Sequence, residues 1–467
     1  MATTMRTDPT FYPSPRLAME APPEHFGFVA TLRTDGKPDA LQTVDLDPGS
    51  QTYGMVVNKL DLPNAGDELH HFGWNACSSM LCPLAGHPFV ERRYLIVPGL
   101  KSSRIHVIDV KNAPGEAKLV KVIEPDEVMR KTGYSRLHTV HCGPEGVFVT
   151  TVGGSGKDGN TGPAGVVLLD CESFDIIGPW EKDHGPQQLG YDFWWHRNEN
   201  IGISSEWAKP PLVENGLQLD ALLRHEYGHC LHIWDLQTRT HKQVIDIGEN
   251  HQMVLELRPA HEPTRVYGFV GVVIDTTNLA SSVWLWHRPN GKFEAKKIIE
   301  IPPEPAAPDL LPPALKQFGA VPPLVSDIDL SMDDKYLYVS CWGLGELRQY
   351  DVSDPHAPNH TGTVRIGGIA RRTPHPSGNR AQGGPQMVEI SRDGKRIYFS
   401  NSLYAPWDPI FYPDGMAGWV AMAKSKPGGG IDLDQRLFVQ FEDGYRAHQV
   451  RLEGGDCSTE SFCFPSA

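Results

Sequence analysis

Several histidines of this chain stand where their imidazoles could share one metal ion. Six of them lie in or beside short β-rich runs: His70, His71, His138, His141, His261 and His448. Neutral imidazole is a good ligand for Zn, Cu, Fe and Ni. A group of these side chains would therefore form a transition-metal site, provided that the fold brings them to one place.

Carboxylates and thiols accompany these histidines. Glu256 and Asp327 lie in similar β-rich runs and could fix the imidazole tautomers or bind the metal directly. Cys77 and Cys142 follow histidines closely, and a thiolate there could bind a soft metal or selenium. The alternative is that both are buried, inert thiols.

A second histidine motif has a poorer sequence context. His225 to His229 reads HEYGH, which matches the HExxH pattern of zinc proteases. That chemistry needs both histidines on one face of a continuous helix. Here Gly228 interrupts the motif and a β-rich run begins at Cys230, so we expect an insertion between strands and no protease site.

The composition of the chain argues against some classes of function. The net charge is −14, which argues against a groove that tracks nucleic-acid phosphates and against binding to anionic membranes. Residues 1–24 lack an apolar core of signal-peptide length, and no apolar run approaches the roughly 20 residues that span a bilayer. We therefore expect a cytoplasmic protein whose eight cysteines, without a CxxC pair, are free thiols.

The elements that must position these side chains form a repeat. One type of β-rich run recurs at intervals of 54 to 71 residues, beginning at Arg92, Gly146, Asn200, Arg265, Tyr336 and Arg396. Another type precedes these and occurs seven times, beginning at Leu69, Leu137, Leu189, Met253, Val325, Gly384 and Tyr445. Repeats of four short strands at such spacing are typical of propeller blades.

The ends of the repeat indicate how the ring closes. Three β-rich runs before Asp67 have no innermost strand in front of them, and the run from Tyr445 has no blade after it. Pairing these ends removes exposed sheet edges. We predict an all-β, seven-bladed β-propeller closed by its N- and C-terminal strands, with an extension over residues 1–23 and a single domain over 24–467. A two-domain β-sandwich is the alternative.

In a propeller, the first strand of each blade lines the central channel. Because side chains alternate along a strand, one set near each strand start would point into that channel. The candidates are His70 or His71, His138, Tyr191 or Asp192, Glu256, Asp327, Gln386 and His448. His141 and His261 lie a few residues further along, and Trp194 and Trp195 could shape a small apolar pocket nearby. The pattern predicts a transition-metal site on the axis, although polar residues also line such channels without a function.

Long motifs resemble the selenium-binding protein/methanethiol oxidase family from about Asp67 to Cys457. They are DELHHFGWNACSS from Asp67, LGYDFW from Leu189, ISSEW from Ile203, LRQYDVSDP from Leu347, GGPQM from Gly383 and GGDC from Gly454. The resemblance implies an enzyme that oxidises methanethiol with O2 and water to formaldehyde, hydrogen sulfide and hydrogen peroxide. It implies copper, with ligands among His70, His71, His138, His141, His261 and His448.

Other roles follow from the same resemblance. Glu206, Asp327 or Glu256 could move the proton, and Cys77 and Cys142 are candidates for selenium. Animal members carry a further cysteine where this chain has Gly54, which puts selenium binding through that thiol in doubt. The expected partners are a small thiol and O2, without nucleic acid or membrane, and the sequence does not define an oligomeric state.

Two functions of other classes compete with the oxidase. A non-enzymatic selenium or metal carrier would bind without turnover, and a propeller scaffold would bind protein partners without needing a metal. The histidine pattern disfavours the scaffold, whereas the sequence does not separate the oxidase from the carrier.

Overall fold

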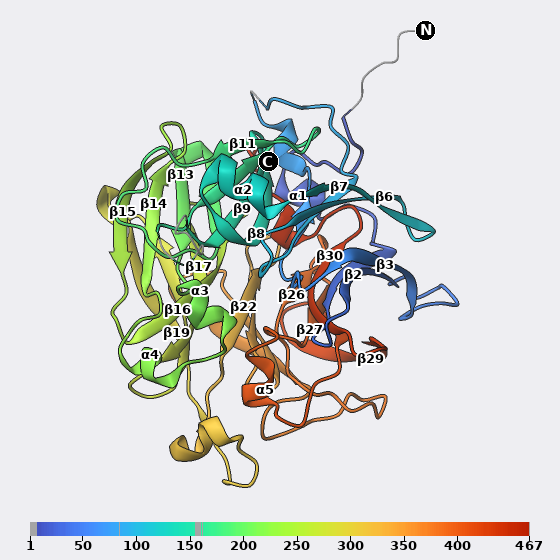
Figure 1. Cartoon of the computed structure of the whole chain (residues 1–467), viewed down its shortest axis with the longest axis vertical. Coiled ribbons are helices and arrows are strands. Elements are labelled where there is room, and N and C mark those ends of the chain that lie inside the picture. Colours follow the sequence, from blue (N-terminus) through green and yellow to red (C-terminus); the bar gives the residue numbers. More distant parts are fainter. Residues whose placement is uncertain (1–6, 84, 155–159, 161, 467) are drawn as a thin grey trace.

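Seven four-stranded antiparallel sheets make up this protein. A computed structural model describes residues 7–83, 85–154, 160 and 162–466, and within these it also has a small two-stranded ribbon. The first strands of successive sheets contact one another around the centre. In Figure 1, strands β8, β22, β26 and β30 accordingly lie near the middle, and β3, β7, β15 and β29 lie toward the periphery. The predicted seven-bladed propeller is confirmed.

Each blade runs from its innermost strand outward through four strands. The first three blades are β30 (Arg446–Leu452), β1 (Phe26–Leu32), β2 (Pro38–Asp45) and β3 (Val56–Ala65); β4 (Gly73–Trp74), β5 (Tyr94–Pro98), β6 (Ile105–Asn112) and β7 (Glu116–Ile123); β8 (Ser135–Gly143), β9 (Gly146–Gly153), β10 (Val166–Leu169) and β11 (Ile176–Pro179).

The next two blades are β12 (Phe193–His196), β13 (Ile201–Ser205), β14 (Cys230–Asp235) and β15 (Thr240–Asp246); β16 (His251–Pro259), β17 (Tyr267–Asp275), β18 (Ser281–His287) and β19 (Glu294–Ile301). The last two are β22 (Val325–Leu330), β23 (Tyr336–Cys341), β24 (Glu346–Asp351) and β25 (Asn359–Arg365); β26 (Val388–Ile390), β27 (Arg396–Ser400), β28 (Trp419–Ser425) and β29 (Ile431–Gln440). The ribbon is β20 (Glu304–Pro305) with β21 (Ala320–Val321).

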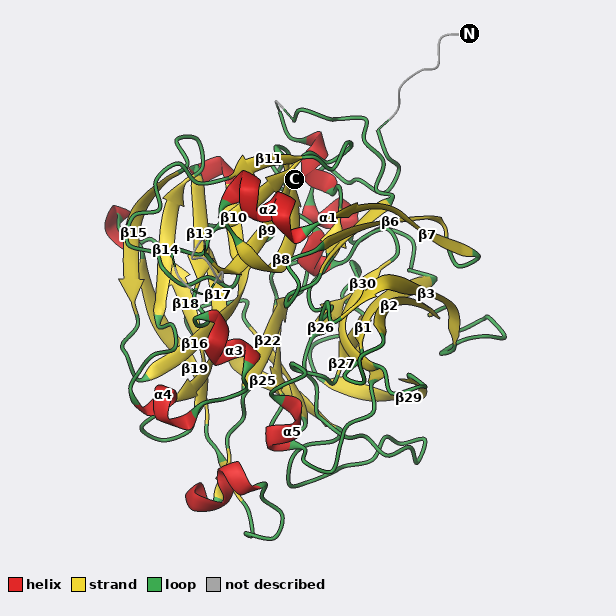
Figure 2. Ribbon diagram, viewed as in Figure 1, coloured by secondary structure: helices red, strands yellow, loops and turns green. Residues whose placement is uncertain are grey.

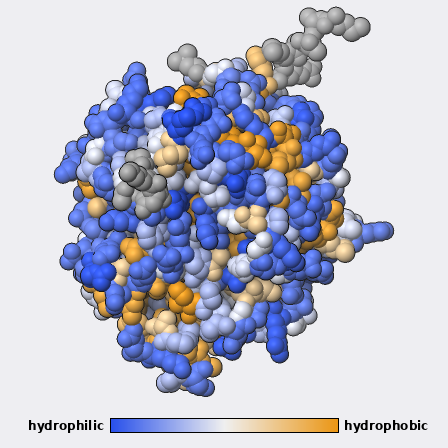
Figure 3. Space-filling model, in the orientation of Figure 1, coloured by the Kyte–Doolittle hydropathy of each residue, from blue (hydrophilic) through white to orange (hydrophobic). Residues whose placement is uncertain are grey.

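Burial follows position within the blade. Inner and middle strands such as β8 and β9 are almost wholly buried, because sheets pack on both of their faces. Outer strands such as β7, with the sequence EAKLVKVI, alternate between exposed and partly buried residues. The face in Figure 3 is correspondingly mostly hydrophilic, with apolar residues in scattered small patches.

The ring closes where β30 pairs with β1, as predicted. Phe28 lies opposite Arg451 and Val29 opposite Val450 in an antiparallel register. One blade therefore combines the last strand of the chain with the first three, and neither of these strands is left as an open edge.

Helices are few and short, and they lie outside the blades (Figure 2). The α-helices of the described residues are α1 (Pro15–Ala18), α2 (Pro125–Thr132), α3 (Pro210–Glu214), α4 (Leu219–Leu223) and α5 (Asp408–Phe411). Short 3-10 helices are η1 (Ser78–Leu81), η2 (Arg197–Glu199), η3 (Pro289–Gly291), η4 (Pro313–Phe318) and η5 (Cys457–Thr459). None of the helices in the described part of the chain combines the length and hydrophobicity needed to cross a bilayer.

The segment before β1 packs against the propeller. The Phe11 ring is buried in the same core as residues of β5, β6 and β8, and the backbone N–H of Tyr12 donates to Ser78 Oγ. The division into an extension and a single domain from residue 24 stays a prediction.

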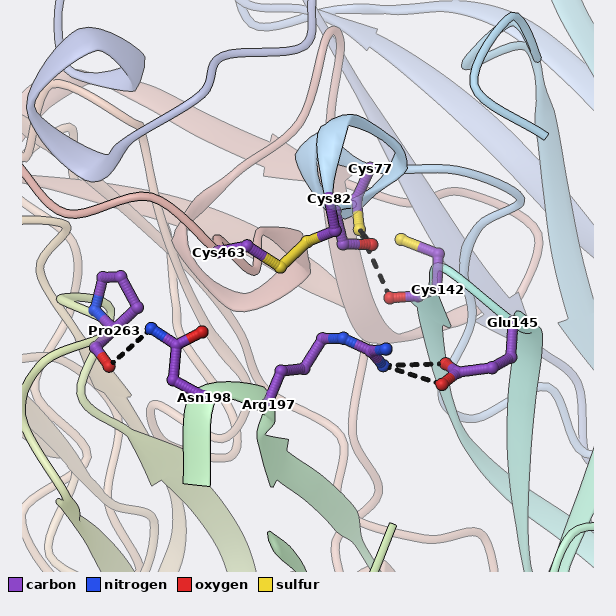
Figure 4. Close-up of a disulfide and its surroundings, with 9 residues drawn as sticks. Cys77, Cys82, Cys142, Glu145, Arg197, Asn198, Pro263 and Cys463 are labelled. Carbon is purple, nitrogen blue, oxygen red and sulfur yellow. Dashed lines mark hydrogen bonds and ion pairs between the residues drawn. A yellow bond between two sulfur atoms is a disulfide. The ribbon is translucent and has the colours of Figure 1, made fainter. Parts of the chain in front are cut away.

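The expectation that all eight cysteines are free thiols is wrong for two of them. Cys82 and Cys463 form a disulfide across a separation of 381 residues (Figure 4), and the other six are free. Ring closure brings the C-terminal segment beside the first blades: the Ser78 N–H donates to Glu460 Oε2 at 2.9 Å. A spacing pattern along the sequence could not show this pairing.

Candidate metal centre

Four buried imidazoles converge near the starts of the inner strands. The rings of His70 and His448 have centroids 3.4 Å apart, and the rings of His71 and His138 have centroids 4.3 Å apart. His70 also lies 4.9 Å from His138. Ligand nitrogens of His70, His71 and His138 all lie within 4.8 Å of one another. These three side chains could hold a metal ion, and the four rings together, with His448 against His70, are called the imidazole cluster.

Hydrogen bonds to backbone carbonyls leave one nitrogen free on three of these rings. His70 Nε2 donates to the Leu403 carbonyl at 3.1 Å, and His448 Nδ1 donates to the Ser402 carbonyl at 2.8 Å. His138 Nδ1 faces the Tyr191 carbonyl at 3.1 Å. The other nitrogen of each ring is buried without a hydrogen-bond partner. A carbonyl that holds the N–H fixes the lone pair on the opposite nitrogen, as in metal-binding histidines.

His71 is held differently. Its Nδ1 lies 3.4 Å from the amide nitrogen of Gln449, and its Nε2 lies 3.4 Å from Glu256 Oε1. The Gln449 amide cannot turn over freely, because its oxygen accepts the Phe72 N–H at 2.7 Å. His71 is thus the member of the cluster that faces a carboxyl group.

Burial keeps the cluster neutral. Desolvation lowers the pKa of His138 to about 4 and that of His448 to about 3. The pKa values of His70 and His71 also lie well below the usual range, first because of burial and then because of the neighbouring imidazoles. Neutral rings offer lone pairs, which a metal ion requires.

Local irregularities in the inner strands aim these side chains. In β8, His138 and Thr139 together oppose one residue of β9, and in β30, His448 and Gln449 together oppose one residue of β1. Such β-bulges re-aim side chains and are common beside functional sites. His70 and His71 precede the two-residue strand β4, so alternation does not apply to them and both rings reach the cluster.

One predicted carboxylate lies at the cluster and a second lies behind it. Glu256 Oε1 accepts the Tyr191 hydroxyl at 2.8 Å, and its Oε2 lies 3.2 Å from Arg258 Nη1. Burial raises the pKa of Glu256 to about 7. Asp327 lies 3.3 Å from the same Arg258 and accepts the Val388 N–H at 2.6 Å. Asp327 therefore supports the arginine that holds Glu256.

The third predicted carboxylate faces another group. Glu206 Oε1 lies 3.0 Å from His232 Nε2, and its Oε2 accepts the Cys230 N–H at 3.1 Å. Both oxygens are thus engaged by residues of β14 in the same blade, away from the imidazole cluster.

Two of the six predicted histidine ligands also lie elsewhere. His141 Nε2 bonds to Asp192 Oδ1 at 2.8 Å, and its ring packs on Trp194. His261 Nε2 donates to the Leu330 carbonyl at 3.0 Å. Both histidines stand beyond the strand starts, where each finds a partner of its own.

The two candidate selenium ligands are buried close to the disulfide. Cys77 Sγ donates to the Cys142 carbonyl at 3.2 Å, and both side chains appear beside Cys82 in Figure 4. Burial raises the pKa of Cys142 well above the usual thiol range. Burial also opposes ionisation of Cys77, but hydrogen bonds from the thiol of Cys142 and from Ser79 outweigh it and lower the pKa of Cys77.

The HEYGH motif has no continuous helix. Helix α4 ends at Leu223, His225 adopts a φ of 58°, and β14 begins at Cys230. His225 Nδ1 is hydrogen-bonded to the Glu249 carbonyl. The zinc-protease arrangement is therefore absent from this described segment.

Sequence reasoning missed Gln449 and Arg258 as parts of this site. Gln449 is adjacent to a predicted ligand, and in a regular strand its side chain would point the opposite way; only the bulge places it beside His71. Arg258 lies two residues beyond Glu256, and this spacing was the available signal, since alternate residues of a strand share a face.

The fold and the cluster define a class: a β-propeller with a candidate metal centre of buried imidazoles on its axis. Within that class, the chain matches the 56 kDa selenium-binding protein family over residues 5–463 and belongs to it. The resemblance seen in the sequence motifs is thereby confirmed.

Relatives of known name cover nearly the whole chain. Methanethiol oxidase of Xenopus tropicalis is 37% identical over 96% of this chain and 97% of its own. Selenium-binding protein 3 of Arabidopsis thaliana is 37% identical over 96% of both chains. A solved structure of a hypothetical selenium-binding protein from Sulfolobus tokodaii superimposes with a TM-score of 0.95 and 52% identity, covering 98% of this chain and all of the other.

Proposed function

We propose that this protein is a methanethiol oxidase whose imidazole cluster binds copper. The observation that carries the proposal is the convergence of four buried rings: the ligand nitrogens of His70, His71 and His138 lie within 4.8 Å of one another, and the ring of His448 lies 3.4 Å from that of His70. Relatives named methanethiol oxidase support the substrate. The proposed reaction converts methanethiol, O2 and water to formaldehyde, hydrogen sulfide and hydrogen peroxide, with all atoms balanced.

Copper bound there would supply a soft site for the thiolate and would exchange electrons with O2. Four imidazoles suit copper, and the closed channel keeps bulk water away from them. In this proposal the carbonyls of Leu403, Tyr191 and Ser402 orient the rings. Glu256 Oε1, near neutral pKa and bonded to the Tyr191 hydroxyl, takes up and returns the substrate proton.

A selenium or metal carrier is the second candidate. Relatives named selenium-binding protein and the lowered pKa of the Cys77 thiol favour it. A carrier would bind its ligand without releasing products from methanethiol, so one experiment separates the two functions.

The test measures copper content and product release on the same samples. We expect about one copper ion per chain, as a single imidazole site would hold, together with hydrogen sulfide and peroxide release that stops on chelation. The variant His138→Gln should lose both copper and products. His375→Gln is the matched control, because His375 is equally buried and bonds to the distant Asp434 carbonyl. Folded, copper-loaded protein that releases no product would overturn the oxidase and leave the carrier.

A further inference from the structure

An apolar cavity lies beside the imidazole cluster. Its volume is about 40 Å³, and its walls include Trp207, Leu222, Leu255, Leu403 and Trp407. Leu222 comes from α4 and Trp407 immediately precedes α5, so these short helices cover the cavity from outside. The Trp407 indole donates to the Val213 carbonyl of α3 and so joins α3 to the start of α5. Figure 2 shows α3, α4 and α5 on the same side of the propeller.

The cavity and the cluster share walls. The Trp207 ring lies 6.0 Å from that of His138 and 6.1 Å from that of Tyr404, and Tyr404 in turn lies 5.8 Å from His70. Leu403 lines the cavity with its side chain and accepts the His70 N–H with its carbonyl. A molecule in the cavity would therefore be separated from His138 by the Trp207 ring and from His70 by Leu403.

The lining accepts hydrocarbon and rejects charge. Ser326 is its single polar side chain among the described residues, and the Ser326 hydroxyl already donates to the Gln386 carbonyl. Placing an ammonium or carboxylate group there would leave the charge unpaired in an apolar space, which is strongly unfavourable.

The volume of the cavity limits the size of the molecule that can bind in it. One water molecule needs about 10–15 Å³ on the same measure of volume. A cavity of about 40 Å³ therefore has room for roughly three heavy atoms. Methanethiol has two and ethanethiol has three, whereas thiols that carry amino-acid or peptide groups are far larger.

We propose that this cavity is an alkyl pocket that receives small alkyl thiols, sulfur included, beside the cluster and so selects them over charged thiols. This inference rests on the proposed oxidase function for its substrate class. The described structure assigns the selection among thiols to the side chains of Trp207, Leu222 and Leu255. None of these three residues is a candidate metal ligand.

The test changes the size of the pocket from its outer wall. Leu222→Ala enlarges the cavity, so the affinity of the metal-free protein for 1-propanethiol relative to methanethiol should rise about tenfold. The matched control is Leu223→Ala on the same helix, since that side chain is 57% exposed and should leave the ratio unchanged. Binding is followed by calorimetry or by the fluorescence of Trp207 and Trp407.

A second measurement needs no variant. Crystals of the wild type under xenon pressure should show xenon in the pocket, because dry apolar cavities bind it. No xenon in the pocket, or an unchanged affinity ratio in folded Leu222→Ala, would overturn the alkyl pocket even if the enzyme oxidises methanethiol. A shifted ratio without any oxidation would instead overturn only the oxidase.

Discussion

Each histidine of the cluster is oriented by a group that the protein backbone or an amide supplies. Carbonyl oxygens hold the N–H of His70, His138 and His448, whereas Gln449 and Glu256 flank His71. The sequence suggested that carboxylates would fix the tautomers. Carbonyls hold three of the four rings, and Glu256 faces the fourth, His71.

Glu256→Gln should separate proton transfer from metal binding. The amide keeps the shape of the side chain but cannot take up a proton, so we expect turnover to fall about 100-fold or more. Copper content should stay at the wild-type level, because the ligand rings are untouched. Steady-state product release and metal analysis on the same preparation check this.

A control variant tests whether turnover falls merely because a buried carboxyl group has been removed. Glu346 is also buried and is paired with Arg348 and Arg365, far along the chain from the cluster. Glu346→Gln should keep full turnover. Equal losses in the two variants would mean that Glu256 acts only through stability.

At the scale of strands, β-bulges determine which adjacent residues of an inner strand both point toward the central channel. In β16, Leu255 and Glu256 together oppose one residue of β17, at the place where β8 and β30 carry their bulges. Alternation along each run suggested His138, Glu256 and His448, and the structure brings these three residues to the same buried group. It could not indicate Gln449, since a bulge depends on the paired strand and leaves little trace in one sequence.

The contacts between strands of the third blade include a carboxyl group whose titration should affect stability. Glu181 is buried beyond β11, accepts the Tyr134 hydroxyl and the Val166 N–H, and lies near His184. Burial raises its pKa from 4.5 to about 7. The folded state therefore holds a proton that the unfolded state releases, and stability is lost as the pH rises from about 4.5 through about 7.

Glu181→Gln should remove this loss. Relative to the variant, the wild type should lose up to about 1.4 kcal/mol of unfolding free energy per pH unit within that window. Urea unfolding at pH 5 and pH 7.5 measures the difference. The exposed Glu442→Gln should behave as the wild type, and parallel pH profiles for wild type and Glu181→Gln would refute the assignment.

For the whole molecule, repetition made the architecture predictable. Seven inner runs, with three strands before the first and none after the last, were enough to place the closure at β30 and β1. The disulfide between Cys82 and Cys463 was missed, because the cysteines are brought together only by the closed ring and the path of the last residues. It also weighs against the expected cytoplasmic location, since disulfides persist mainly in oxidising compartments.

Removing that disulfide should destabilise the ring. Cys463→Ser frees the C-terminal segment and should lower the unfolding free energy by at most about 5 kcal/mol, because the cross-link spans nearly the whole chain. Thermal unfolding with and without reductant measures the effect, and reductant should not change the variant further. A wild type insensitive to reductant would contradict the prediction.

Closure through β30 also sets the order in which the centre can form during synthesis. His70, His71 and His138 leave the ribosome early, but His448 belongs to the final strand and takes its place only when that strand joins β1. A nascent or truncated chain thus holds an incomplete set of imidazoles. For the proposed copper site, the fourth imidazole thus becomes available only after β30 has been made and the ring has shut, so shorter chains would hold copper less well and would be poorer sites for uncontrolled oxygen chemistry.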